Sequence, residues 1–164
     1  MSQKVEVIKQ ETETLLVKFQ EMKKVFEEEA QSQMKQIVQM IFDESPDLGA
    51  IIWTQYSPYF NDGDECVFSV HEISFTNATE PDDLDEIHCE CYDGNNPDIW
   101  AADLYDYKHS HEDKKKNISI DLLEYFNEFI QNSDIEDVME MMFGNHVKVI
   151  ATRDGFNIEQ YDHE

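Results

Sequence analysis

Glycine and proline are both scarce in this chain of 164 residues, and their scarcity narrows what the protein can be. Only 5 glycines and 4 prolines occur, which leaves little material for the glycine-rich loops that cradle phosphates. The chain also lacks the sequence signatures of P-loop and Rossmann nucleotide-binding proteins, of serine hydrolases and of zinc peptidases. We therefore expect a protein that is not an enzyme and that uses no cofactor.

The chain has only 3 cysteines, which argues against a secreted, disulfide-stabilised protein. The number is odd, and Cys89 and Cys91 are separated by a single residue, unlike the disulfide framework of a small secreted domain. The polar N-terminus does not resemble a signal peptide, and no apolar run approaches the roughly 18–20 residues of a membrane span. These features favour the cytoplasm as the compartment.

Basic residues are scarce as well, with 12 Lys and Arg against 37 Asp and Glu and a formal net charge of -25. This charge argues against direct binding to nucleic acid, and it costs stability through self-repulsion. Aromatic residues make up 12% of the chain, whereas a disordered acidic tail contains few. We therefore expect a folded domain with an acidic surface, favoured by a basic partner, a polybasic surface, bound cations or a salt-rich habitat.

The first part of the chain is predicted to be one long helix, from about Lys4 to Phe42, because neither glycine nor proline occurs before Pro46. Apolar side chains recur at intervals of three and four, and those predicted to form a dimer contact are Ile8, Leu15, Phe19, Met22 and Phe26. Such a helix spans roughly 60 Å, more than a small domain covers, so a homodimer is the simplest expectation. The alternative is a helix broken near Glu27–Gln33 that folds back on its own domain.

Residues 46–164 are predicted to form an acidic α+β domain, following a helical dimerisation element in residues 1–45. The expected strands and helices are Ala50–Phe60, Cys66–Thr76, a short helix near Ile99–Tyr105, Ile118–Asn132, a helix capped by Ser133 over Asp134–Phe143, Val147–Thr152 and Phe156–Tyr161. Asn61–Asp64 is expected to be a hairpin turn. The predicted fold is a long, coiled-coil-like N-terminal helix plus a small antiparallel sheet of two hairpins, packed with two C-terminal helices.

Charge placement is the first candidate functional feature. No Lys or Arg occurs from Gln36 to Tyr107, whereas 17 Asp and Glu do. Unmixed carboxylates on a folded surface can imitate the phosphates of nucleic acid, which carries about one charge per 1.7 Å of duplex axis. The residues predicted to bind a basic, nucleic-acid-binding host protein are Asp82, Asp83, Asp85, Glu86, Glu90, Asp93, Asp98, Asp103 and Asp106. The alternative is a merely acid-biased composition with a solvated surface.

A metal site is the second candidate feature, and its signal is weak. His88, Cys89 and Cys91 place three donor side chains within four positions. Structural zinc sites use four ligands, commonly with C-x2-C spacing, and the C-x-C spacing here has no second cysteine pair to complete it. The acidic turns around Gly63 and Gly94 also fail the EF-hand pattern, which needs Asp five residues before the glycine. A metal-binding module therefore stays a weaker alternative.

The segment Trp53–Val70 contains the run WTQYSPYFNDGD. It resembles the WTQYTPYFNDGD-type hairpin of small acidic proteins from tailed bacteriophages and some bacteria. The resemblance covers about a tenth of the chain, and it implies a phage-type or prokaryotic origin rather than an activity. The residues themselves indicate a structural role, with Trp53, Tyr56 and Phe60 as core or cross-strand side chains.

Origin and charge together favour one function at this stage. We expect a phage-type acidic inhibitor that mimics nucleic acid and blocks a host nucleic-acid-binding or defence protein in the host cytoplasm. The alternative is an adaptor or structural protein that assembles through the long helix and uses its acidic residues only for solubility. The two differ in which surface carries the function, either the carboxylates or the apolar stripe of the helix.

Overall fold

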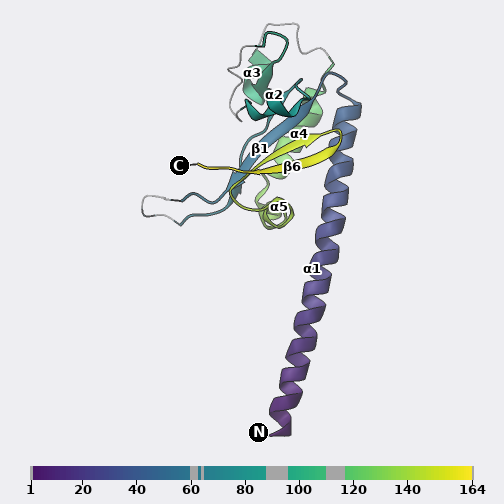
Figure 1. The fold of residues 1–164 in the computed structure, drawn as a ribbon, viewed down its shortest axis with the longest axis vertical. Coiled ribbons are helices and arrows are strands. Elements are labelled where there is room, and N and C mark those ends of the chain that lie inside the picture. The colour runs from purple at the N-terminus through teal and green to yellow at the C-terminus, as the bar shows by residue number, and fades with distance from the viewer. Residues whose placement is uncertain (1, 60–62, 64, 88–95, 110–116, 164) are drawn as a thin grey trace.

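One unbroken helix of 41 residues, α1 (Gln3–Asp43), projects from an α+β domain in the computed structural model (Figure 1), which describes residues 2–59, 63, 65–87, 96–109 and 117–163. Every side chain from Ser2 to Phe26 is exposed. The last third of α1 is anchored, because Met34, Val38 and Phe42 are buried in the core of the domain. The long helix is therefore confirmed, and the alternative of a break near Glu27–Gln33 is wrong.

The domain is built on an antiparallel sheet with strand order β4-β3-β1-β5-β6, in which β2 also pairs with β1. The strands are β1 (Ala50–Tyr56), β2 (Ser69–Val70), β3 (Ser74–Thr76), β4 (Ala101–Asp103), β5 (Val147–Thr152) and β6 (Gly155–Gln160). The central strand β1 pairs with three others, and β5 and β6 form the predicted C-terminal hairpin. The predicted α+β fold is confirmed.

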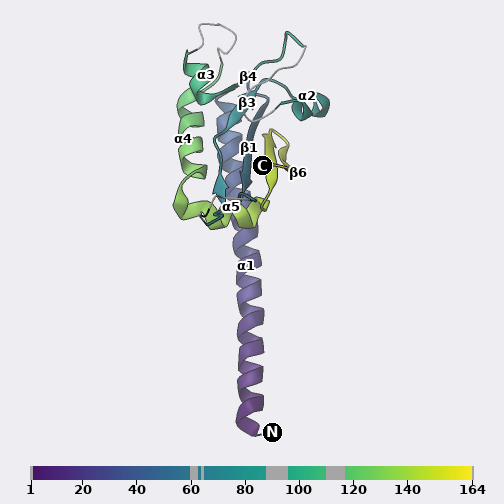
Figure 2. The same cartoon turned by 90° about the vertical axis from the view of Figure 1, so that its left-hand side faces the viewer.

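Helices cover both faces of this sheet (Figure 2). On one face α1, α4 (Ile120–Ile130) and α5 (Glu136–Phe143) enclose the main core, and on the other face lies α2 (Pro81–Asp85). Side chains of β1 alternate between the two, so that Trp53 enters the main core whereas Ile52 packs beside Leu84 of α2. The indole of Trp53 makes edge contacts with Phe126 at 5.8 Å and with Phe143 at 5.6 Å between ring centroids.

The segment predicted as one strand, Cys66–Thr76, is interrupted between β2 and β3. At the interruption His71 N–H donates to the Thr54 carbonyl, and Ile73 N–H donates to Oδ1 of Asn127 on α4 at 3.0 Å. The side chain of Asn127 is buried and takes the place of a strand neighbour for Ile73. The chain thus leaves the sheet for a few residues without leaving this buried amide N–H unpaired.

The interruption also changes which face the side chains occupy. Gln55 is paired with Val70, and Ile52 with Ser74, so the two residues of β1 between these pairs oppose three residues of the neighbouring segment. One extra residue of this kind is a β-bulge, and it shifts the alternation of side chains by one position. Val70 and Phe75 consequently share the main core, whereas in an unbroken strand Cys66–Thr76 they would point to opposite faces.

Two other local predictions need correction. The helix expected near Ile99–Tyr105 is instead the strand β4 followed by α3 (Leu104–His109). The helix expected from Asp134 begins as a 3-10 turn, Ser133–Ile135, whose cap is the side chain of Asn132 rather than Ser133. Oδ1 of Asn132 accepts from Asp134 N–H at 2.9 Å, and an amide is as good an N-cap as a hydroxyl.

Candidate functional site

The first group of predicted acidic residues lies on and directly after α2. Pro81 occupies the first turn, and Asp82 and Asp83 follow there, where the N-terminal end of a helix favours negative charge. Leu84 and Ile87 point into the second core and attach α2 to the sheet. Three carboxylates of this group, those of Asp82, Asp85 and Glu86, are exposed.

A second group of carboxylates lies where β4 runs into α3. Oδ1 of Asp103 accepts from the Asp106 backbone N–H at 2.7 Å, so Asp103 acts as the N-terminal cap of α3. Glu72, from the interrupted segment between β2 and β3, faces this pair. Burial raises the pKa of the Glu72 carboxyl, and the negative charges of Asp103 and Asp106 raise it further. The three carboxylates thus lie close enough for their negative charges to repel one another.

Two basic residues of the domain, Lys148 and Arg153, are bonded elsewhere. Nζ of the buried Lys148 donates to the Ile87 carbonyl at 2.8 Å, at the end of α2. Arg153 donates to the backbone carbonyls of Leu48, Ser45 and Pro46, just beyond α1. Both cations therefore stabilise backbone carbonyls, and neither forms an ion pair with the α2 group or with the carboxylates around Asp103.

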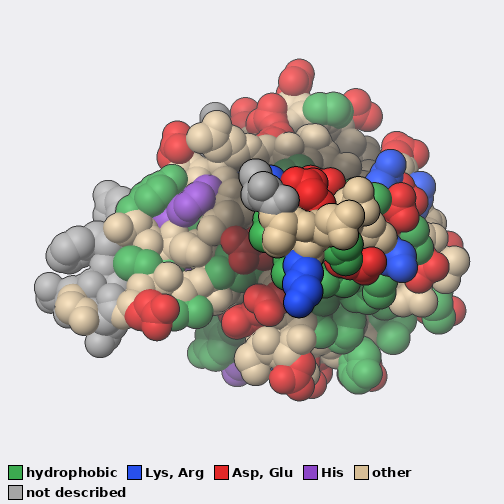
Figure 3. Space-filling view, turned by 90° about the horizontal axis from the view of Figure 1, so that it is seen from below, with side chains coloured by type: hydrophobic (Ala, Val, Ile, Leu, Met, Phe, Trp, Pro, Cys, Tyr) green, Lys and Arg blue, Asp and Glu red, His purple; other side chains and the backbone are tan. Residues whose placement is uncertain are grey.

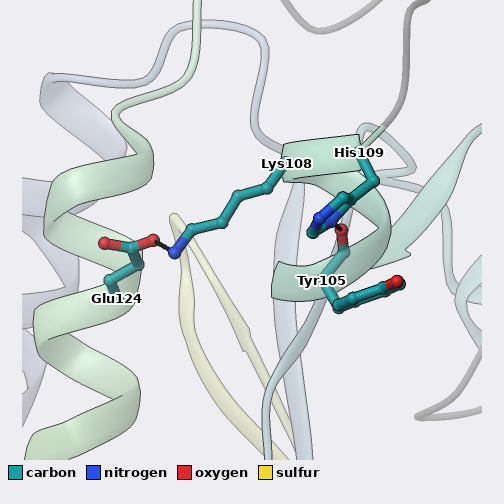
Figure 4. A network of polar contacts seen from close by, with 4 residues as sticks. All are labelled: Tyr105, Lys108, His109 and Glu124. Atoms are coloured by element: carbon teal, nitrogen blue, oxygen red, sulfur yellow. Dashed lines mark hydrogen bonds and ion pairs between the residues drawn. The ribbon is translucent and has the colours of Figure 1, made fainter.

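Lys108 of α3, in contrast, does pair with a carboxylate. It forms an ion pair with Glu124 of α4, while Nδ1 of His109 lies 2.8 Å from the Tyr105 carbonyl within α3 (Figure 4). This pair joins the two helices on the surface, and it leaves Asp103 and Asp106 at the other end of α3 without that cation.

The structure separates the predicted acidic residues into two groups. The α2 group packs on the second core, whereas α3 is attached through Leu104 to the main core on the other face of the sheet. Asp98 is exposed in the turn before β4, where its carbonyl accepts from the Asn77 side chain at 2.7 Å. Glu90 and Asp93 lie outside the described residues. The carboxylates are thus displayed from both faces of the sheet.

A histidine–tyrosine cluster at the end of β1 escaped the sequence analysis. Its rings are stacked, with His163 lying 3.6 Å from Tyr56 and 4.2 Å from Tyr59 between centroids, and with Tyr56 4.3 Å from His71. Nδ1 of His146 lies 2.7 Å from Nε2 of His163. No sequence spacing signals this cluster, because its members come from four distant segments of the chain.

Histidine 71 should make the stability of the protein sensitive to pH. Burial lowers the pKa of His71, and the neighbouring His163 lowers it further. A histidine with a lowered folded-state pKa contributes stability above about pH 6.5 that is lost as the pH falls toward the folded-state pKa. We expect the free energy of unfolding in urea to decrease between pH 7.5 and 5.5, and to decrease less in a His71→Gln variant. An equal decrease in both proteins would contradict this assignment.

The apolar stripe predicted for dimerisation lies on the projecting part of α1. Its members, Ile8, Leu15, Phe19, Met22 and Phe26, are each between 51% and 70% exposed. Figure 3, which looks along the molecule from the N-terminal end of α1, shows apolar side chains in patches among acidic and other polar ones. A groove of about 720 Å³ between α1 and α4 adjoins the stripe, and Met40, Leu122, Tyr125 and Phe129 contribute to its lining.

The metal candidates His88, Cys89 and Cys91 lie outside the described residues. Among the residues that the structure does describe, no group of three or more His, Cys, Asp or Glu side chains is placed to hold a metal ion. Within the same residues, no helix combines the length and the apolar character needed to cross a membrane.

Comparison of the chain with protein-family models, with curated proteins and with solved structures gave no match. The candidate functional features of the molecule are therefore the two acidic groups, the histidine–tyrosine cluster, and the apolar stripe with its groove.

Proposed function

We propose that this protein is a phage-type acidic inhibitor, without catalytic activity, that mimics nucleic acid in the host cytoplasm. Its carboxylates would occupy the phosphate-binding groups of a host nucleic-acid-binding protein, for example a defence nuclease. One observation carries the proposal: the exposed carboxylates of α2 and those around Asp103 are left without the cations Lys148 and Arg153, which bond to backbone carbonyls instead.

Electrostatics favours mimicry of nucleic acid over the alternative that the acidic surface serves solubility alone. Carboxylates that repel one another, as the raised pKa of Glu72 indicates, cost stability in the free protein. A cleft lined with Lys and Arg removes that repulsion on binding, as it neutralises the phosphates of DNA. Binding of this kind is fast and weakens steeply with salt.

Neutralising the α2 group should weaken capture of a basic partner. We expect the variant Asp82→Asn/Asp85→Asn/Glu86→Gln to recover at least 10-fold less of the partner from a bacterial lysate at low salt, because it loses three exposed carboxylates from one surface. The partner is identified by mass spectrometry, and the wild-type protein should lose it at high salt.

A matched control separates the site from the total charge. The variant Asp137→Asn/Asp154→Asn/Glu128→Gln removes three exposed carboxylates from other surfaces, and it should retain the partner. An equal loss of the captured partner in both variants would mean that net charge alone governs binding. Recovery of no nucleic-acid-binding protein by the wild type would contradict the proposal.

The exposed stripe of α1 favours a second candidate, an adaptor that assembles through this helix. Five large apolar side chains at helical spacing on an isolated helix have no structural role within one chain. For an adaptor, substitutions in the stripe should abolish function and the α2 variant should not. A captured partner that persists at high salt would support this candidate.

A further inference from the structure

The apolar stripe continues past the projecting part of α1 and into the groove beside α4. Ile37 and Met40 follow Phe26 at helical spacings of 11 and 14 residues, which return to the same face of a helix with about 3.6 residues per turn. Both remain exposed, at 37% and 65%. The residues that attach α1 to the domain, Met34 and Val38, lie on a different face. Glu29 and Gln33 lie on the same face between Phe26 and Ile37, in a smaller groove that Phe26 and Ile37 also line. The stripe and the groove beside α4 therefore form one apolar surface that these two polar residues interrupt.

We infer that this surface is covered by α1 of a second copy of the chain, which runs antiparallel to the first. The N-terminal end of each α1 then lies in the groove between α1 and α4 of its partner. A pairing that places Met22 opposite Phe26 of the partner subunit also places Ile8 opposite Met40 of the partner subunit, because both pairs are centred on the same point of the helix. In this register Leu15 and Phe19 lie opposite Gln33 and Glu29 of the partner subunit. The contact has two-fold symmetry, so each chain contributes the same residues to it, and the assembly is complete with two chains.

The charges of the chain select the antiparallel orientation. Residues 2–24 contain 5 Lys and 4 Glu, a net charge of +1. The net charge of the whole chain is -25, so the rest of the chain carries -26. A parallel dimer would place the two acidic domains side by side and the Glu27–Glu29 run of each helix against its own copy. An antiparallel dimer separates the domains by roughly 20 Å of paired helix, more than twice the Debye length of about 8 Å.

The rim of the groove matches the end of the helix that it would receive. Asp43, Glu44 and Asp121 flank the groove, and the N-terminal end of α1 carries Lys4 and Lys9. In the dimer, apolar side chains of the entering helix thus contact the apolar lining of the groove, and its lysines lie beside the carboxylates that flank the groove. Complementary charge of this kind fixes the register and orientation of a contact more than its strength.

This inference rests on the association role of α1 and does not depend on capture of a basic protein. The mass of the full-length protein in solution, measured by light scattering after size exclusion, should be that of two chains for the wild type. Phe19→Glu places a charge in the stripe and should give the mass of one chain. Val17→Glu makes the same kind of change on the opposite face of the same helix, where Val17 is 52% exposed, and should remain a dimer.

Fluorescence of the buried Trp53 reports whether each variant keeps its core, so that unfolding of a variant is not mistaken for dissociation of the dimer. A single-chain mass for the wild type, or equal dissociation of both variants, would overturn the inference. A failure here would leave salt-sensitive capture by the α2 group intact, whereas a failure of capture would leave the dimer intact.

Spin labels test the orientation. With the native cysteines replaced by serine, a label at Gln10→Cys should lie roughly 40 Å from its copy in an antiparallel dimer, because about 28 residues of helix separate the two sites. A label at Lys24→Cys is level with the two-fold axis, on the outer face of the helix, and should give a clearly shorter distance than the label at Gln10→Cys. Short distances at both sites would indicate a parallel dimer and would overturn the inference.

Discussion

Replacing Trp53 by alanine should lower the free energy of unfolding by about 3–5 kcal/mol, the cost of removing a large aromatic side chain from a close-packed core. Trp53 is fully buried, and its indole contacts Phe126 of α4, Phe143 of α5 and Phe156 of β6. The substitution therefore removes the side chain through which the sheet holds both C-terminal helices. Small domains have only about 5–15 kcal/mol of stability in total, so a large part of the population should unfold at moderate temperature.

Urea unfolding followed by circular dichroism measures this loss. The protein concentration is kept the same for every variant, because the stability of a dimer depends on it. Tyr105→Ala removes another large aromatic residue, but one that is 66% exposed on α3, and it should change the free energy of unfolding by no more than about 0.5 kcal/mol. A loss of similar size in the two variants would refute the central role of Trp53.

Replacing Gln55 by leucine should cost about 2–5 kcal/mol, although the two side chains are similar in size. The side chain of Gln55 is fully buried at the next inward-facing position after Trp53. Its Oε1 accepts from Trp53 Nε1 at 3.1 Å, and its Nε2 donates to the carbonyls of Met139 at 2.9 Å and of Gly144 at 2.8 Å. Leucine removes all three hydrogen bonds, and a buried polar group left without a partner costs about 1–3 kcal/mol, partly offset here by apolar burial.

Gln55→Glu provides a sharper comparison for the same site. A carboxylate still accepts from the indole but cannot donate to the two carbonyls that end α5, and it adds a buried charge. We expect it to be at least as destabilising as leucine at pH 7 in thermal unfolding. If both variants melted like the wild type, the hydrogen bonds of Gln55 would not be what attaches the end of α5 to the sheet.

These two residues also explain the most distinctive part of the sequence. Trp53 and Gln55 open the run that resembles phage-type hairpins, and both are committed to the core. Tyr56 and Tyr59, from the same run, enter the stacked histidine–tyrosine cluster. The described part of this run is thus accounted for by packing and stacking, which agrees with the structural interpretation of its residues. The acidic groups and the stripe on α1 lie outside it.

The long helix and the C-terminal hairpin were predictable because both are determined by local pattern. Spacing of three and four without proline or glycine specifies a helix, and the Arg153–Gly155 turn between alternating strands specifies a hairpin. The same pattern identified the exposed stripe, since a helix longer than its domain leaves part of its apolar face uncovered. Net charge likewise followed from composition alone.

The bulge and the two acidic groups were not predictable, because long-range contacts decide them. The bulge between β2 and β3 depends on Asn127, which is 54 residues from Ile73 in the sequence. Whether a carboxylate keeps a counter-ion depends on where Lys148 and Arg153 point, and both point to backbone carbonyls. Side-chain direction of this kind has no signature in the order of residues.

The sequence by itself therefore determined the long helix, its apolar stripe, the α+β class and the acidic character of this protein. Only the tertiary structure decided that the stripe runs into a groove beside α4, that the carboxylates divide between the two faces of the sheet, and that three distant histidines stack with tyrosines. The physical reason is the range of the interactions. Periodicity and composition record what each residue does with its near neighbours, whereas grooves, clusters and unpaired charges arise where distant segments pack together.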